Sequence, residues 1–452
     1  MKRFFNKSLE LWKKSKSRKP LLIRGARQVG KTWVVREHGK SYANFIEINL
    51  ESQPEYIPFF KENFGKPERL IQQICSLSGQ KIVIGETLLF IDEIQASKEA
   101  LLSLRYFCEK LPLQHVIAAG SLLEFTFQEL SFPVGRIEYL YLYPLSFKEF
   151  LSVQGLDGLM EETEKSFREK KPLSVPLHEK MLQELRVYFL IGGLPEAVSS
   201  YVDYHDFHGV QKIQQTLLIG YREDFHKYAS RAQVSHLDTV FQAIPRLIGK
   251  KFKYSEVNEK LRSRELGAAL QLLEQAGLAY KIHHSSCEAL PLGSQSNLKK
   301  FKVFSLDMGL CQRLLNVDLA QAFALKQDWS AHKGALAEQF VAQELVSYGF
   351  ECMRPELHCW YREERSAQSE IDFVIPLVTK DGTKIIPVEV KSERGHGMRS
   401  LGLFLGTKSK NSPFGIVISS QGFEEKEKVK YVPLYGIWML QNFNEEENLD
   451  SS

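Results

Sequence analysis

The chain has 452 residues, which is too long for one ordinary globular core and indicates about three domains. Hydrophobic residues make up 43% and charged residues 25% of it, a balance that excludes a wholly disordered protein. The 59 Lys and Arg against 55 Asp and Glu give a net charge of +4, which neither demands nor excludes a nucleic-acid partner.

The chain lacks the sequence marks of secretion and of membrane insertion. Its six cysteines form no Cys-x-x-Cys pair and have no zinc-like spacing with histidine, so we expect reduced thiols and a cytoplasmic location. No apolar run approaches the roughly 18 to 20 residues that span a bilayer, so we expect no membrane contact. The first twenty residues predict a short basic helix. Either it is a solvated helix that leads into the first domain, or it contacts nucleic acid or a partner.

From residue 20 to about 150, apolar strands alternate with helical patterns, which is typical of a parallel sheet flanked by helices. The predicted strands are residues 21–24, 44–50, 87–92, 115–120 and 137–143. The segment 155–180 is rich in Glu, Lys, Ser and Pro, and we expect a loop or insertion there, with helices resuming at Met181.

The second half of the chain predicts three further regions and a tail. Residues 181–230 look helical and are interrupted by a Gly-Gly-Leu-Pro turn at 192–195. Short helices at 253–278, followed by a hairpin of 279–283 and 300–304, predict a winged helix. Strands at about 370–376, 384–391 and 414–419 follow a helix that starts at 333. The expected domains are therefore an α/β P-loop core (1–150), a helical lid and linker (151–230), a winged-helix-like region (231–325), a carboxyl-terminal α/β domain (326–443) and an acidic tail (444–452).

A phosphate-binding loop is predicted at residues 25–32, which read Gly-Ala-Arg-Gln-Val-Gly-Lys-Thr directly after an apolar strand. The two glycines permit backbone N–H groups to point at phosphates, and Lys31 would reach the terminal phosphates. Thr32 supplies a hydroxyl for magnesium at the positive end of a helix. The predicted ATP-binding residues are Gly25, Ala26, Arg27, Gln28, Val29, Gly30, Lys31, Thr32 and Trp33, together with Ser121.

The second half of this site is predicted at the end of the strand 87–92. Asp92 would hold Mg²⁺ and Glu93 would polarise the attacking water, because transfer of a phosphoryl group to water needs a positioned base beside the metal. The alternative is that these acids only cap a following helix.

Two more residues are candidates with open alternatives. Ser121 ends an apolar strand, where it either senses the terminal phosphate or caps a helix. Arg136 is either an arginine finger for the nucleotide of a neighbouring subunit, which would require a homo-oligomer, or a solvated or ion-paired arginine.

Together these segments resemble a known group, the prokaryotic AAA+ type P-loop ATPases that carry a carboxyl-terminal DUF4143 domain. The likeness includes the loop at 25–32, residues 89–95 and Ala-Gly-Ser at 119–121. It also includes Tyr-Pro-Leu-Ser-Phe at 143–147, Gly-Gly-Leu-Pro and the late segments 370–374 and 387–392. The resemblance implies a central ATPase, a winged helix and a nuclease-like carboxyl-terminal fold.

Near the end of the chain, Asp372 is followed by Glu389 and Lys391, which project from the same strand face. Glu338 on the preceding helix adds a fourth polar group. The arrangement looks like the PD-(D/E)xK (restriction-endonuclease-like) fold, in which the acids hold Mg²⁺ or Mn²⁺ and the lysine assists water. The proline of that motif is replaced by Ile371. The alternative is an exposed ion pair on a strand face.

Two functions remain open from the sequence. The first is an enzyme that hydrolyses ATP and acts on nucleic acid, DNA rather than RNA, with a nuclease-like domain. The second is an ATP-regulated switch or interaction protein whose carboxyl-terminal fold only binds a partner. Basic residues that favour nucleic-acid contact, or form only a solvated helical face, are Lys250, Lys251, Lys253, Lys260, Arg262 and Arg264.

Overall fold

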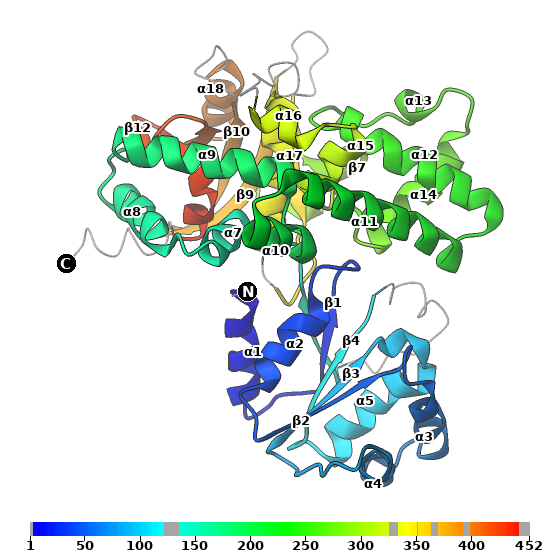
Figure 1. Ribbon diagram of the computed structural model, residues 1–452. Coiled ribbons are helices and arrows are strands. Elements are labelled where there is room, and N and C mark those ends of the chain that lie inside the picture. The colour runs from blue at the N-terminus through cyan, green and yellow to red at the C-terminus, as the bar shows by residue number, and fades with distance from the viewer. Residues whose placement is uncertain are drawn as a thin grey trace. The chain divides into compact units, whose positions relative to one another are not determined.

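The computed structural model describes residues 3–121, 135–324, 333–349, 351–362, 369–391 and 398–442 (Figure 1). The expected acidic tail at 444–452 lies outside these residues. The chain divides into two compact units between Tyr143 and Pro144, and the short pieces 275–277 and 351–354 belong to the first unit. We call them the amino-terminal and the carboxyl-terminal unit and describe each by itself.

The amino-terminal unit is built on a sheet of five parallel strands in the order β2-β3-β4-β1-β5. The strands are β1 (Leu21–Arg24), β2 (Asn44–Asn49), β3 (Thr87–Asp92), β4 (His115–Ala119) and β5 (Glu138–Tyr141). The helices are α1 (Phe5–Lys14), α2 (Lys31–Gly39), α3 (Ile57–Glu62), α4 (Pro67–Ser78) and α5 (Lys98–Lys110), with single turns η1 (Pro54–Tyr56) and η2 (Ile94–Ala96). All five predicted strands are confirmed.

The core of this unit explains why these segments become strands. Every residue of β3 and of β4 is buried, as expected for central strands of a sheet covered on both faces. Helix α1 buries Phe5, Leu9 and Trp12 on one face, so the basic amino-terminal segment is an amphipathic helix packed on this unit.

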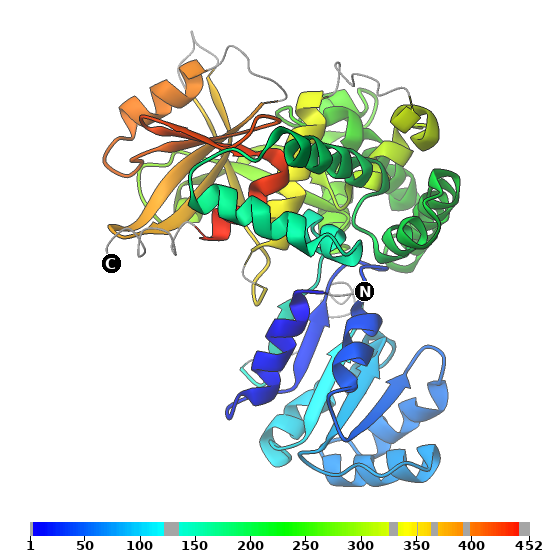
Figure 2. The ribbon, with the colours of Figure 1, turned by 60° about the vertical axis from the view of Figure 1, so that its left-hand side comes forward.

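The carboxyl-terminal unit combines helices with a sheet of eight strands, within the residues described, in the order β12-β13-β11-β10-β9-β8-β6-β7. The helices are α7 (Phe147–Val153), α8 (Asp157–Arg168), α9 (Val175–Ile191), α10 (Pro195–Tyr204), α11 (Phe207–Tyr228), α12 (Arg231–Leu247), α13 (Tyr254–Val257), α14 (Ser263–Gln275), α15 (Met308–Leu314), α16 (Leu319–Ala324), α17 (Lys333–Ser347) and α18 (Met398–Thr407), with turns η3 (Leu292–Gln295) and η4 (Leu434–Asn442). The strands are β6 (Ala279–Ser285), β7 (Ser296–Ser305), β8 (Leu357–Tyr361), β9 (Glu370–Thr379), β10 (Gly382–Val390), β11 (Gly415–Ser419), β12 (Glu424–Lys426) and β13 (Val429–Pro433). Figure 2 shows the long antiparallel pair β9 and β10 in this sheet.

The predicted hairpin is present as β6 and β7, but it does not stand alone. Strand β6 pairs in parallel with β8, with Ile282 opposite Leu357. One continuous sheet therefore contains strands from both sides of the boundary that we expected between 325 and 326. Sequence patterns mark strands, but they do not say which distant strand completes a sheet edge.

We expected a loop or insertion at 155–180 with helices only from Met181, and the prediction that this segment lacks helices is wrong. Helix α8 occupies 157–168, and α9 begins at Val175. Although the segment is rich in charged residues, Met160, Thr163 and Phe167 recur at helical spacing and are buried on one face of α8. The Glu and Lys residues between them form the solvated side of an amphipathic helix.

The two most specific motifs of the resemblance meet in the carboxyl-terminal unit. The Leu145 N–H donates to the Gly193 carbonyl at 2.6 Å, and the Gly193 N–H donates to the buried Asp307 carboxylate at 2.7 Å. A Cβ at Gly193 would lie 2.1 Å from the Leu145 carbonyl oxygen, so only glycine fits there. Ser146 caps α7 through a capping box with Glu149. The Pro-Leu-Ser-Phe and Gly-Gly-Leu-Pro motifs are therefore two sides of one backbone contact.

Candidate nucleotide site and carboxyl-terminal carboxylate cluster

The loop between β1 and α2 has the backbone geometry that the sequence predicts. Gly25 and Gly30 have φ angles of 148° and 95°, and a Cβ at Gly25 would lie 2.2 Å from the Leu142 carbonyl oxygen. Glycine is therefore required at Gly25 for both conformation and space. Helix α2 begins at Lys31, so its first N–H groups and positive dipole end face the loop. The loop fits a bound phosphate.

Lys31 is held at this loop. Its ammonium donates to the carbonyls of Gly25 at 3.0 Å and Ala26 at 2.8 Å, which keeps the buried side chain over the loop. Of the other predicted residues, Ala26 and Val29 are buried, Trp33 is half-buried and Gln28 is exposed. Lys31 can thus neutralise an anion bound by the loop amides.

Thr32, in the first turn of α2, meets Asp92 at the carboxyl end of β3. The Thr32 hydroxyl donates to Asp92 Oδ2 at 2.8 Å, and the Asn49 amide lies 3.4 Å from the same oxygen. Burial raises the pKa of Asp92 from its ordinary value. A hydroxyl and one carboxylate fit the way Mg²⁺ is held beside phosphates.

Glu93 follows Asp92 in a left-handed conformation with φ of 49°, which turns its side chain out of the strand direction. Its carboxylate accepts a hydrogen bond from the Gln95 side-chain amide. Sequence reasoning assigned no role to Gln95 or to Asn49. Both are polar residues close to a predicted metal strand, and that proximity is the only signal that would have marked them.

Ser121 lies directly after β4, which runs between β3 and β1. Its hydroxyl accepts from Arg27 Nε at 3.2 Å, so the sheet brings Ser121 to the edge that carries the phosphate loop. Arg27 also pairs with Glu51 at 3.6 Å. The observed contacts join the loop to the end of the neighbouring strand.

Arg136 lies at the opposite end of the strands from the phosphate loop. It precedes Glu138, which pairs with Leu21 at the start of β1, whereas the loop follows the end of β1. Its guanidinium pairs with Glu109 at 3.0 Å and its side chain is 52% exposed. The ion-paired alternative describes its place in this chain, and a role at the nucleotide of another subunit stays a prediction.

Arg3 is a residue of the site that the sequence did not mark. Although the first helix is exposed on its basic side, the Arg3 guanidinium is buried and donates to the Val29 carbonyl at 3.2 Å and the Tyr143 carbonyl at 2.7 Å. The Arg3 guanidinium thus holds the backbone of the phosphate loop at Val29 through a charge-assisted hydrogen bond.

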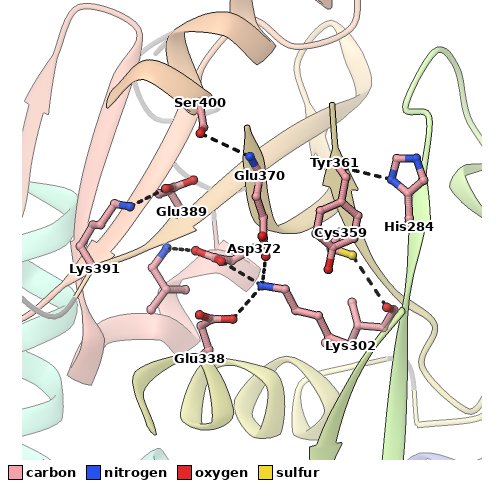
Figure 3. Close-up of polar contacts among 12 residues, drawn as sticks. His284, Lys302, Glu338, Cys359, Tyr361, Glu370, Asp372, Glu389, Lys391 and Ser400 are labelled. Atoms are coloured by element: carbon pink, nitrogen blue, oxygen red, sulfur yellow. Dashed lines mark hydrogen bonds and ion pairs between the residues drawn. The ribbon is translucent and has the colours of Figure 1, made fainter. Parts of the chain in front are cut away.

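In the carboxyl-terminal unit, Glu338 and Asp372 come together around a lysine that was not predicted. Lys302 on β7 is fully buried, and its ammonium lies 2.9 Å from Glu338 and 3.1 Å from Asp372 (Figure 3). It also pairs with Glu370. Burial alone would lower the pKa of Lys302, but these carboxylates raise it well above its ordinary value.

The other two predicted residues form a separate pair at the end of β10. Lys391 donates to Glu389 Oε1 at 2.5 Å, while Glu389 is 5% exposed and its Oε2 has no hydrogen-bond partner among the residues that the structure describes. Burial, together with the nearby Asp372 charge, raises the pKa of both Glu389 and Glu338 above the ordinary value. Within the described ranges, no three His, Cys, Asp or Glu side chains are grouped to hold a metal ion.

The fold and the loop geometry define a P-loop protein of the AAA+ type. Comparison with protein families gives the same class, since an AAA domain family matches residues 17–151. A domain of unknown function, DUF4143, matches residues 333–437, and another, DUF8612, matches residues 182–321. The chain therefore carries an AAA domain at residues 17–151 and a DUF4143 domain at residues 333–437.

No curated protein sequence matches the chain. Among solved structures, a Walker-type ATPase of Pyrococcus abyssi is similar at 19% identity and a TM-score of 0.43, covering 69% of this chain and 94% of that one. C. elegans PCH-2 follows at 13% identity, TM-score 0.26, and coverage of 45% and 58%. A DNA-bound Drosophila ORC chain has 12% identity, TM-score 0.26, and coverage of 66% and 90%. Likeness this distant carries no argument about function.

None of the described helices is long and apolar enough to span a bilayer. The six cysteines, all within the described ranges, are free thiols.

Proposed function

We propose that this chain binds ATP with Mg²⁺, hydrolyses it, and acts on nucleic acid. The observation that carries the proposal is the convergence of Lys31, Thr32, Asp92 and Glu93 at the ends of β1 and β3. Lys31 and the loop amides would hold the phosphates, and Thr32 and Asp92 would hold the metal. Glu93 would then orient and deprotonate the attacking water.

Two substitutions separate binding from hydrolysis. Lys31→Ala should abolish ATP binding, because the chain then lacks the charge that faces the phosphates. Glu93→Gln should keep binding but slow single-turnover hydrolysis by about 10² to 10⁴, since the amide cannot take a proton from water. The matched control is Glu86→Gln, an exposed acid that precedes β3 at the opposite end. Unchanged hydrolysis in Glu93→Gln would move the catalytic role elsewhere.

Support for nucleic acid comes from charge around α12 to α14. Six basic side chains there are exposed: Lys250, Lys251, Lys253, Lys260, Arg262 and Arg264. Phosphate contacts through such residues predict DNA binding that weakens steeply with salt.

The test for nucleic acid is ATP turnover with and without DNA at several salt concentrations. The triple change Lys260→Gln, Arg262→Gln and Arg264→Gln should reduce DNA stimulation and the salt slope. A control of equal charge loss is Lys165→Gln with Arg168→Gln and Lys171→Gln, at exposed positions in and after α8. If both triple variants reduce DNA stimulation equally, the stimulation depends on the overall charge of the protein and not on the basic residues around α12 to α14.

A second candidate is the ATP-regulated switch, whose carboxyl-terminal unit binds a partner without cutting it. The buried ion pair of Lys302 with Glu338 and Asp372 favours this candidate for that unit. Parent and Asp372→Ala proteins would be incubated with single- and double-stranded DNA and RNA, in Mg²⁺ and in Mn²⁺, with and without ATP. Cleavage by the parent alone would support a nuclease. Equal binding without cleavage supports the second candidate.

A further inference from the structure

The carboxylate cluster of the carboxyl-terminal unit has a cation built into it. Glu338 comes from α17, Asp372 and Glu370 come from β9, and all three carboxylates converge on the ammonium of Lys302 from β7 (Figure 3). The Lys302 side chain is 0% exposed, so water does not compete for it. Three acids from two elements thus share one buried positive charge.

The nuclease-like fold implies a divalent metal at this cluster, but the residues present do not fit one. Mg²⁺ requires ligand oxygens at about 2.0 to 2.1 Å, whereas an ammonium already lies 2.9 Å from Glu338 and 3.1 Å from Asp372. A metal bound by the same oxygens would lie next to this ammonium in a buried site, where like charges repel strongly. The second Asp372 oxygen accepts the Val390 N–H at 2.9 Å.

Lys391, which forms the separate pair with Glu389, differs from Lys302 in its number of acidic partners and in its exposure. Lys391 pairs with the carboxylate of Glu389, and its side chain is 30% exposed. A lysine with this exposure can turn its ammonium toward solvent. Lys302 has three acidic partners and a side chain that is 0% exposed, so these contacts hold its ammonium in place.

We propose that Lys302 is a tethered cation that takes the place of the divalent metal in this fold. The carboxylates of Glu338, Asp372 and Glu370 then serve to hold a lysine, and the unit does not cut phosphodiesters by metal-assisted hydrolysis. This inference goes beyond the ATP-dependent function and holds whether or not the chain hydrolyses ATP.

The test measures Mn²⁺ binding to the nucleotide-free full chain, by calorimetric titration and by electron paramagnetic resonance of free Mn²⁺. All proteins carry Asp92→Asn, which removes the carboxylate that would hold the metal at the nucleotide site. Lys302→Met replaces the ammonium by an apolar side chain of similar length. The matched control is Lys281→Met on the neighbouring strand β6, which also loses a lysine–carboxylate pair, with Glu274.

With Lys302 present, we expect no Mn²⁺ binding up to about 1 mM, a concentration at which even weak oxygen sites fill. Lys302→Met should bind one Mn²⁺ per chain, and Mn²⁺ should raise its midpoint of thermal unfolding. Adding Asp372→Asn should remove this binding, and Lys281→Met should not create it.

Two results would overturn the proposal. One is a Mn²⁺ ion bound while Lys302 is present and lost on Asp372→Asn, which would establish an ordinary metal centre. The other is a folded Lys302→Met protein that binds no Mn²⁺, which would show that the carboxylates do not form a latent metal site. If Lys302→Met does not fold, Mn²⁺ binding is compared between the Asp92→Asn protein and the same protein with Asp372→Asn added. Binding that is lost on Asp372→Asn then overturns the proposal, and no binding by either protein supports it.

Discussion

Glu344 on α17 gives a sharp test of how the carboxyl-terminal unit is held together. Its carboxyl group accepts the Phe147 N–H at 2.9 Å and the Tyr348 hydroxyl at 2.8 Å, so it binds the backbone of the Pro-Leu-Ser-Phe motif. The group is fully buried, and burial raises its pKa from 4.5 to about 8. The folded protein therefore keeps this carboxyl group protonated at neutral pH.

The sign and size of the effect follow from this pKa. Because the pKa is higher in the folded state, the stability from the protonated form is complete below about pH 4.5 and is lost as pH rises through about 8. At about 1.4 kcal/mol per pKa unit, the shift corresponds to about 5 kcal/mol. Glu344→Gln stays neutral and can still accept from Phe147. We expect near-parent stability at pH 5, and a gain that grows toward about 5 kcal/mol at pH 9.

The assay is urea unfolding from pH 5 to 9, combined with hydrogen exchange of residues 144–153 as a local measure of the motif. The contrasting variant is Glu344→Ala, which leaves the Phe147 N–H without its acceptor and should be about 2 to 4 kcal/mol less stable than Glu344→Gln at every pH, because neither variant can ionise at this position. Parallel stability curves for the parent and Glu344→Gln across this range would refute the reasoning, since they would mean that Glu344 titrates normally in the folded state.

Three further predictions concern the nucleotide site. Gln95→Ala should slow hydrolysis by about 10- to 100-fold and leave the ATP affinity unchanged, because the Glu93 carboxylate loses the amide that holds it. An equal loss of ATP binding and of turnover would contradict this positioning role. Arg3→Ala should lower the unfolding free energy by about 3 kcal/mol and raise the Kd for ATP, since the Val29 carbonyl loses its donor. Urea denaturation measures the first effect and nucleotide titration the second. An unchanged Kd would show that Arg3 does not support ATP binding by the loop. Arg136→Ala should leave ATP turnover within about twofold of the parent. A loss of turnover near 10³ that depends on protein concentration would instead show that Arg136 acts as an arginine finger for a neighbouring subunit.

The nucleotide site could be located from the sequence because its residues are close together in the chain. An apolar run followed by the glycine loop fixes β1 and the start of α2, and β3 ends at Asp92 where the acidic pair was expected. Arg3 could not be located, because its acceptors are carbonyl groups that any residue carries. A backbone acceptor leaves no mark in the sequence.

The carboxyl-terminal unit was harder because its contacts are distant in the chain. Lys302 lies 70 residues from Asp372, and it stands in a run of lysines that reads as an ordinary hairpin strand. Asp307 is likewise 114 residues from the glycine that it holds. Strand periodicity predicts that residues face the same side, but the strand order decides which side chains meet.

The two acidic sites show why a carboxylate alone does not define a metal centre. Asp92 is held by the hydroxyl of Thr32 and an amide, both neutral donors, so its negative charge remains for a divalent cation beside phosphates. Asp372 also ends up buried near a second acid, yet its counter-charge is already supplied by Lys302. Since a buried charge must be compensated, the side chain that compensates it decides whether a metal is needed. The same acidic residue type therefore predicts metal binding at β3 and a permanent ion pair at β9.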